Sequence, residues 1–491
     1  MKKIVVYLIS SIITLLIILI AILSTAGIET NKFNKLISEK ASKTKNIYLD
    51  LETIKFKINP KELSLFIETR NPEITYKGVT VPVQNVKLFI DFFSLIKSNP
   101  QIKKAVLVLK ELDITQLNQL SVLIKPSNFK SLINNKVKEG KLISEIEIFL
   151  TEQGNFKDFI AKGTVKGLKA ELFNNLNLTK TNLGFFADKN DILIKNIFGN
   201  LEDVEIFDGD IKLNLEKGIK LNSNFKSKIN FDEKLLNKYT RFFNNYKLFN
   251  NIKNLKATFN NNISINLDKT YKVKDYNYSI SGNLDKAKIE LSNPVKIDFF
   301  QEEIKTIHLV NLKIDTMFNP KNNNLKGEGT YSLNSSDYLK VNFNNNFNNN
   351  SNNLKLNFGY GNSLELDLIN YKKTKETVAN FVIDLEKKKE NIKINKFNFE
   401  ENNNLISIYG LVFKNNKFST FKSIKILTKN NDFSIQKDKK IKIKGSKFDA
   451  TNLSKFLSNQ KSGNILQNLS SDIEIDFASM KVPMSENLSN F

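Results

Sequence analysis

The sequence predicts a mostly β protein: an N-terminal transmembrane helix followed by an elongated antiparallel β-meander with a few short helices. Three observations predict this class. An uncharged stretch rich in Ile and Leu stands near the N-terminus, and much of the remainder alternates apolar and polar residues with the period of a strand. Clusters of Asn, Asp, Gly and Lys separate the alternating segments, as is typical of hairpin turns.

The first element is the apolar segment from Ile4 to Leu23. About 20 such residues span the hydrocarbon core of a bilayer. The alternative is a cleaved signal peptide, because two lysines precede the segment and small residues follow at 24–26. Signal peptides have apolar regions of only about 7 to 15 residues. We therefore expect an uncleaved transmembrane signal anchor over residues 1–28 and a polar connection over 29–46.

Strands are expected over most of the remaining chain. An N-terminal β region is predicted for residues 47–230 and a β-meander region for 253–450. Helical periodicity of about ten residues is rare between the strands, which argues against parallel βαβ units. The clearest alternating segments are Ile47–Leu51, Ile54–Ile58, Leu63–Ile67, Ile211–Leu215, Ile263–Leu267, Ala287–Leu291, Leu354–Phe358 and Leu364–Leu368.

A few short helices interrupt this pattern. The clearest is an amphipathic helix over residues 231–252, where Leu, Tyr and Phe recur at three- and four-residue steps. Three shorter helices are predicted at Asp91–Lys97, at Asp113–Leu123 with an Asp cap, and at Thr451–Gln460.

The strands pose the question of where their apolar faces are buried. Two sheets can pack face to face as a sandwich, or one curled sheet can leave an apolar groove that holds lipid chains. Periodicity alone does not choose between them. The candidate lipid-facing strand positions are Leu354, Leu356, Phe358, Leu364, Leu366 and Leu368.

Composition argues against common catalytic sites. The chain has no Cys and one His, which excludes thiolate zinc sites, Cys nucleophiles and His-pair metal sites. Asp208-Gly209-Asp210 is predicted to be a hairpin turn, and His308 a strand surface position. The glycine pairs at 327–329 and 359–361 lack the third glycine of a dinucleotide loop. We therefore expect no enzymatic activity, no cofactor and no metal.

The net charge of +23 raises the question of nucleic acid as a partner. Of 74 basic residues only Arg70 and Arg241 are arginine, whereas phosphate and base recognition favours the bidentate arginine fork. Lys, Asn, Ile and Phe are all abundant, which indicates compositional bias. No nucleic-acid partner is expected.

Several short segments resemble the AsmA-like envelope proteins, including the YhdP and TamB relatives. After the anchor come Asn71–Tyr76, the strand Val86–Ile90, the turn Phe93–Ile96 and the strand Val106–Leu109. Near the other end, Gly445–Ala450 is similar to the start of the family's C-terminal β region.

The resemblance implies a single-pass protein of the bacterial inner membrane with its large domain in the periplasm. It implies a curled-sheet groove that binds or transports phospholipid between the inner and outer membranes, with inner-membrane lipids, phospholipid acyl chains and other envelope proteins as partners. Residues 451–491 are expected to be the start of the AsmA-like C-terminal region, in a chain that is either a fragment or a short member of the family. The alternative function is a non-catalytic scaffold or assembly factor for envelope and outer-membrane proteins.

Overall fold

The computed structural model confirms the mostly β class, with 68% of residues in strands and 12% in helices. Most strands belong to one sheet, which is not closed. The structure describes residues 2–32, 34–35, 38–39, 47–60, 64–91, 101–121, 130, 134–172, 176–216, 218–239, 251–268, 270, 272–296, 299–415, 417–453, 472–483 and 488–489.

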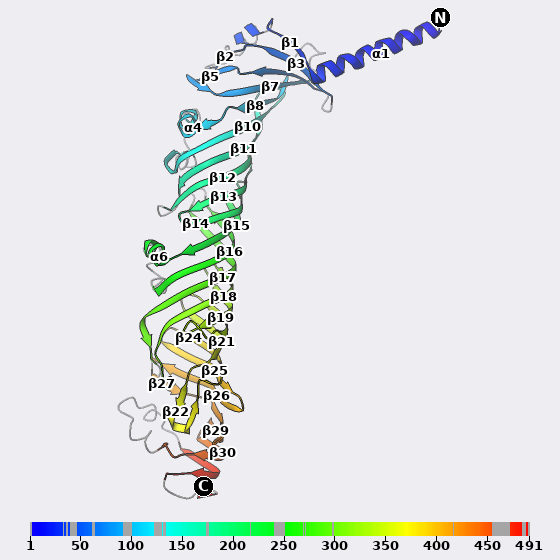
Figure 1. Ribbon diagram of the computed structural model, residues 1–491. Helices are drawn as coiled ribbons and strands as arrows, with labels where there is room; N and C mark the ends of the chain where they lie inside the picture. The colour runs from blue at the N-terminus through cyan, green and yellow to red at the C-terminus, as the bar shows by residue number, and fades with distance from the viewer. Residues whose placement is uncertain are drawn as a thin grey trace. The chain divides into compact units, whose positions relative to one another are not determined.

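The chain divides into two compact units, which are described separately. Unit 1 comprises Met1–Lys226 with Ser264–Lys274, and unit 2 comprises Ser227–Ile263 with Asp275–Phe491. Figure 1 labels the helices and strands of both.

Helix α1 (Lys2–Thr25) opens unit 1. Its segment Val6–Thr25 is long and apolar enough to cross a membrane, a test that a signal sequence near the N-terminus also passes. The amides of Ala26 and Gly27 both donate to the carbonyl of Ile22, at 3.0 and 2.9 Å. Gly27 has φ +73°, the left-handed conformation that commonly ends a helix.

The strands of unit 1 follow one another as antiparallel neighbours over most of the sequence. Their bounds are β1 (Ile28–Thr30), β2 (Ile47–Asp50), β3 (Ile54–Asn59), β4 (Ser64–Arg70), β5 (Glu73–Tyr76), β6 (Val79–Val81), β7 (Val83–Asp91), β8 (Ile102–Leu109), β9 (Leu112–Asp113), β10 (Val137–Leu150), β11 (Phe156–Glu171), β12 (Asn177–Asp188), β13 (Asp191–Leu201) and β14 (Val204–Asn214); β15 (Ile219–Phe231) continues into unit 2.

Helix α4 (Ile114–Ser121) confirms the predicted Asp cap. The Gln116 amide donates to the Asp113 carboxylate at 2.8 Å, and the Gln116 side-chain oxygen accepts from the Asp113 amide at 3.1 Å. This reciprocal pair is a capping box. Beside the helix, Val83, Val86 and Leu112 belong to a small buried core.

Strands β11 to β14 carry a row of β-bulges. The pairing register shifts in each neighbouring pair, and Gly167, Lys180, Asn196 and Asp208 stand near these shifts with positive φ between 51 and 60°. A bulge bends its strand and increases the local twist. Bulges on consecutive strands therefore curl this sheet instead of leaving it flat.

The bulge at Asp208 corrects one prediction. Asp208-Gly209-Asp210 lies inside β14, where Gly209 pairs with Ile197, and is not a hairpin turn. The same residue types tolerate positive φ in a turn and in a bulge, so composition alone did not distinguish the two.

Unit 2 contains the longest run of strands. Its elements are helix α6 (Glu233–Tyr239), strands β16 (Ile252–Leu267) and β17 (Val273–Val295), which both extend into unit 1, β18 (Ile304–Phe318), β19 (Asn323–Ser332), β20 (Leu339–Phe347), β21 (Ser351–Tyr360), β22 (Leu364–Leu366), the 3₁₀ helix η4 (Asp367–Ile369), β23 (Tyr371–Lys373), β24 (Ala379–Lys388), β25 (Asn391–Glu401), β26 (Asn404–Lys414), β27 (Lys417–Thr420), β28 (Ser423–Leu427), β29 (Asp432–Lys437), β30 (Ile441–Asp449), β31 (Ile473–Lys481) and β32 (Leu488–Ser489).

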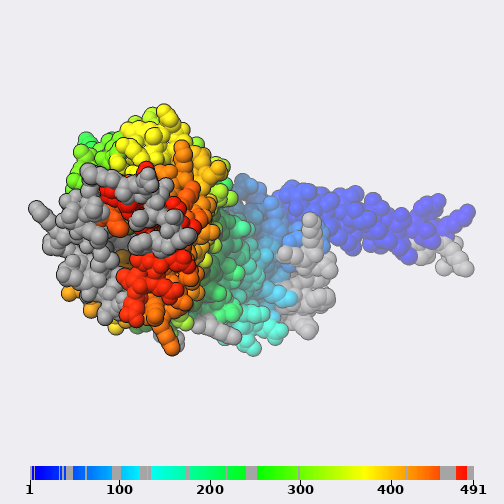
Figure 2. Space-filling model, turned by 90° about the horizontal axis from the view of Figure 1, so that it is seen from below, coloured from blue at the N-terminus to red at the C-terminus, as the bar shows by residue number. Residues whose placement is uncertain are grey.

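From β17 to β30 this sheet is antiparallel, but β31 runs parallel to β30. Figure 2 shows the end of unit 2 where these two strands, in orange and red, lie next to each other. Within the described residues of this sheet, this is the parallel pairing.

All four predicted helices extend beyond the described residues. Helix α6 confirms only the start of the predicted helix at 231–252, because 240–250 lie outside the described residues. Residues 92–97, 122–123 and 454–460 of the other three also lie outside them.

Candidate functional site: an apolar pocket in unit 2

The cross-strand register of unit 2 aligns apolar residues in two continuous rows. The first row is Val341, Phe358, Phe381, Phe399, Ile406, Ile426 and Phe433, and the second is Phe343, Leu356, Ile383, Phe397, Ile408, Ile424, Ile435 and Ile443. Directly paired residues on antiparallel strands share one face of the sheet. Both rows therefore form one apolar face, which we call the inner face.

The row between them starts with Asn342 on β20 and Asn357 on β21 and is polar over the same strands except at Val382 on β24. Both asparagine side chains are exposed. The alternation predicted from the sequence is thus present as two faces of different polarity.

A pocket of about 470 Å³ lies on the inner face across β17 to β25. We call it the first apolar pocket. It is lined by Ile289, Phe299, Phe300, Ile304, Ile307, Leu309, Tyr331, Leu333, Val341, Phe343, Leu356, Phe358, Tyr360, Phe381, Ile383 and Phe397. Many of these side chains, Phe343 and Leu356 among them, are only half-buried. The pocket is therefore an apolar surface that water still reaches.

A second apolar pocket of about 270 Å³ adjoins it, because both are lined by Phe299, Phe381 and Phe397. Leu364 and Leu366 of β22 contribute to the second pocket. Beneath the hairpin formed by β22 and β23, the inner face becomes a closed core in which Phe399 is 2% exposed. Unit 2 therefore combines an open apolar face with a dry core.

The segment Phe299–Phe300 lines the first pocket, and Phe299 also lines the second. Phe300 forms an isolated β-bridge with Leu364, and the carbonyl of Phe299 accepts a hydrogen bond from the Glu365 amide at 3.1 Å. The Phe300 ring stacks on Tyr360 with centroids 4.5 Å apart. Such aromatic pairs contribute about 0.5 to 1.5 kcal/mol beyond the area they bury.

A buried lysine fixes the hairpin that covers the core. Lys373 is 1% exposed, and its ammonium donates to the carbonyls of Gly361, Asn362 and Thr374 at 3.1, 3.1 and 2.8 Å. Burial lowers the pKa of Lys373, while the negative charge of Glu401 acts in the opposite direction. The ammonium thus ties the two ends of the hairpin together.

Glu401 provides the matching acidic group. It is 7% exposed and accepts hydrogen bonds from the Tyr371 hydroxyl at 2.7 Å and from the Asn404 amide at 2.8 Å. Burial alone would raise the pKa of Glu401, but these hydrogen bonds and the charge of Lys373 lower it. Burial also raises the pKa of the Tyr371 hydroxyl, so the hydroxyl keeps its proton and donates a hydrogen bond to Glu401.

The predicted lipid-facing positions divide into three groups. Leu356 and Phe358 line the first pocket, and Leu364 and Leu366 line the second. Leu354 is half-buried on the same face of β21, outside both pockets. Leu368 was placed incorrectly, because the chain turns into η4 after Leu366 and leaves Leu368 37% exposed while Ile369 is buried.

Phe299 and Phe300 were missed by the sequence analysis. They precede β18 and belong to no alternating segment, so the only signal was a pair of adjacent aromatic residues in a connection. Two adjacent aromatic side chains in a connection expose a large apolar surface, which favours packing against another part of the fold.

The other residues considered for chemistry lie apart from the pockets. His308 is half-buried within β18, as predicted, and burial and the nearby Lys288 and Lys286 lower its pKa. Within the described residues, no three His, Cys, Asp or Glu side chains are grouped so as to hold a metal ion.

Unit 1 also has an apolar face on its curled sheet. One row across β10 to β14 consists of Ile146, Ala161, Ala187, Ile192 and Leu213, all half-buried. Among the hydrophobic side chains described on these strands, only Ala170 and Ile197 are buried. A packed sandwich would bury many more hydrophobic side chains, because its two sheets cover each other's inner faces.

Fold and site define a mostly β protein with an apolar pocket on an open sheet face and one N-terminal helix long enough to cross a membrane. Comparison with family models, with curated proteins and with solved structures finds no match for this chain.

Proposed function

We propose that the protein is a membrane-anchored, periplasmic member of the AsmA-like class that binds phospholipid acyl chains on its inner sheet face and moves them between the inner and outer membranes. The first apolar pocket is the observation that carries this proposal. Its volume of about 470 Å³ is within the range of about 300 to 1,000 Å³ that small-molecule sites occupy, and its lining is aliphatic and aromatic.

The energetics of an acyl chain support this type of site. Each methylene moved from water to an apolar surface contributes about 0.8 kcal/mol. Sheltering ten methylenes therefore contributes about 8 kcal/mol before the cost of ordering the chain. Half-buried side chains such as Phe343 and Leu356 gain by the same association, because the chain covers them as well.

The apolar helix α1 supports the anchor. A protein that takes lipid from a bilayer benefits from permanent proximity to it, because tethering replaces a diffusional encounter by a local one. No nucleophile or cofactor is needed, since the chemistry is a transfer between apolar environments.

Site-specific photocrosslinking tests the proposal in cells that express the full chain. A photoreactive residue at position 356 faces the first pocket, and the same residue at 357 is the matched control on the opposite face of β21. We expect phospholipid adducts, detected by mass spectrometry, at 356 and not at 357. Adducts at 356 only with other proteins would contradict lipid binding and favour the scaffold function.

A further inference from the structure

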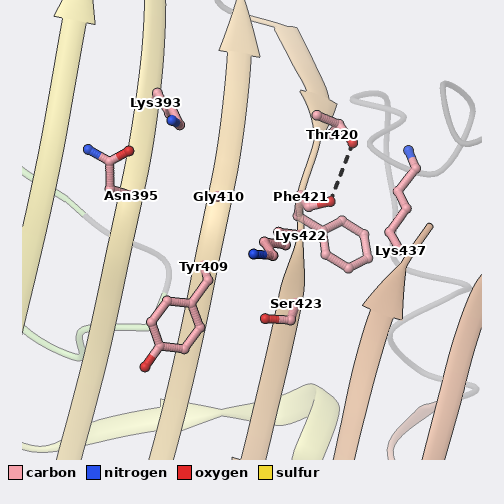
Figure 3. Close-up of a pocket in the computed structure, with 9 residues that line it drawn as sticks. All are labelled: Lys393, Asn395, Tyr409, Gly410, Thr420, Phe421, Lys422, Ser423 and Lys437. Atoms are coloured by element: carbon pink, nitrogen blue, oxygen red, sulfur yellow. Dashed lines mark hydrogen bonds between the residues drawn. The ribbon is translucent and has the colours of Figure 1, made fainter.

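A second type of pocket lies on the opposite face of β25 and β26. Strand β26 pairs with β28 over Leu405–Tyr409 and with β27 over Val412–Lys414, so its partner changes at Gly410 and Leu411. Gly410 has φ +65°. This interruption of the pairing leaves a pocket of about 500 Å³, drawn in Figure 3.

The alternation of strand side chains separates this pocket from the apolar ones. Ile394 and Leu411 line the second apolar pocket, whereas their neighbours Asn395 and Gly410 line the new one. Successive side chains of a strand point to opposite faces. A lipid tail on the inner face therefore does not share this pocket.

The lining of the pocket is basic and polar. It contains Lys393, Asn395, Tyr409, Gly410, Thr420, Phe421, Lys422, Ser423 and Lys437, none of them acidic. In Figure 3 the side chain of Lys422 extends toward β26. Among the residues that the structure describes, no carboxylate forms an ion pair with Lys393, Lys422 or Lys437. Glu386 lies opposite Lys393 on β24, but its carboxylate is 2.5 Å from the Lys388 ammonium.

Another polar pocket of similar size in unit 2 does not have this excess of positive charge. The pocket of about 400 Å³ across β18 to β20 is lined by Lys313 and Lys326, together with Asp315 and Glu328. Its two positive charges are matched by two negative ones. The lysine-rich composition of the chain therefore does not by itself produce a pocket with a charge of +3.

We propose that the pocket around Lys393, Lys422 and Lys437, here called the basic pocket, binds a phosphate group. Three ammonium groups provide point charges for a dianion. The Ser423 hydroxyl supplies a further donor, and so does the Asn395 side-chain amide, which has two N–H groups and donates to the Asp384 carboxylate at 3.2 Å. Gly410 keeps the floor open, because a Cβ there would lie 2.9 Å from the Cβ of Lys422.

The proposal is independent of lipid binding on the inner face. The phosphate belongs either to a small soluble phosphate compound or to the head group of a phospholipid. Both present non-bridging phosphate oxygens, and the experiment distinguishes the two sources.

Isothermal titration of the full chain in a phosphate-free maltoside detergent with inorganic phosphate tests the basic pocket. We expect saturable binding in the micromolar to millimolar range, as suits so small a ligand, weakened by added salt because the contacts are charge-based. The variant Lys422→Gln with Lys437→Gln should bind phosphate at least about tenfold more weakly.

The control variant is Lys313→Gln with Lys326→Gln in the charge-balanced pocket, which removes the same total charge. It should change the affinity by less than about twofold. Equal losses in both variants would show a general effect of net charge and overturn the proposal, as would the absence of saturable binding to the unmodified chain. Unchanged circular dichroism and melting profiles of both variants establish that they fold.

Competition identifies the source of the phosphate. Displacement of inorganic phosphate by glycerol phosphate but not by water-soluble dihexanoyl phosphatidylglycerol supports a soluble ligand at this pocket. Displacement by the short-chain lipid supports a head group. Failure of both compounds to displace bound phosphate would contradict a site open to phosphate esters.

Discussion

Introducing a charge into the first apolar pocket tests whether the inner face is open or part of a dry core. Leu356→Asp places a carboxylate among half-buried apolar side chains. Complete burial of a leucine side chain stabilises by about 1.5 to 3 kcal/mol, so losing a partly buried one costs about 1 kcal/mol. Because water reaches the site, the carboxylate stays hydrated and adds little further cost.

Leu364→Asp is the contrasting variant. Leu364 is 1% exposed, so the substitution loses the full leucine burial and leaves an unpaired charge in the core. Removing one partner of a buried ion pair, which leaves such a charge, costs about 3 to 5 kcal/mol. We expect Leu364→Asp to cost more than about 4 kcal/mol and to open the hairpin that contains Tyr371.

Hydrogen exchange measured by mass spectrometry gives the local opening free energy of each strand, which suits a chain with two units. Leu356→Asp should lower the protection of β20, β21 and β24 by only about 1 kcal/mol. It should nevertheless reduce lipid crosslinking from a photoreactive residue at position 343, which lines the same pocket, about tenfold or more, because an acyl chain would have to desolvate the carboxylate. Asn357→Asp on the opposite face is the control for added charge. A loss of protection in Leu356→Asp as large as in Leu364→Asp would refute an open face.

Three further predictions concern stability. Gly329→Ala should cost about 3 kcal/mol in local opening free energy, because the added Cβ would lie 2.6 Å from a backbone atom. Gly327→Ala should cost only about 1 kcal/mol, because its Cβ would meet the ring of Phe343, which can move. Equal hydrogen-exchange rates in the two variants would contradict this. Asp113→Ala should increase exchange in α4 by an amount equal to about 1 kcal/mol, and Asp113→Asn should largely restore it. The pKa of Glu401 is lowered from 4.5, so the ionised carboxylate stabilises the fold above that pH, and this stabilisation is lost as the pH falls through the folded-state pKa. The β22–β23 hairpin should therefore melt at a lower temperature below about pH 4.5. Glu401→Gln should make the melting temperature less dependent on acid pH.

Much of the fold could be predicted from the sequence because its signals are local. Alternation at Leu354–Phe358 marks β21 and its apolar face, since the strand period is a property of the backbone. The cap at Asp113 was equally readable, because its partner is only three residues away. The apolar length from Ile4 to Leu23 likewise predicted a long helix, which α1 confirms.

Other features depended on contacts that local patterns do not contain. Asp208 could form a turn or a bulge, and the choice follows from where β13 pairs with β14. Leu364–Leu368 has the alternation of a strand, but packing of Ile369 into the core favours the 3₁₀ turn that exposes Leu368. A one-residue change of register reverses every side chain that follows, so such errors change which residues reach a site.

The sequence by itself determined that this chain would build one-sided strands after an apolar helix, because period and length are properties of the residues themselves. Only the tertiary structure decided which apolar faces stay open and which become core. That choice depends on where Phe299–Phe300 and the β22–β23 hairpin pack over the sheet, and their anchors lie far apart in the chain. The basic pocket is equally non-local, because Lys393, Lys422 and Lys437 come from different strands and segments and line one pocket where the pairing of β26 changes.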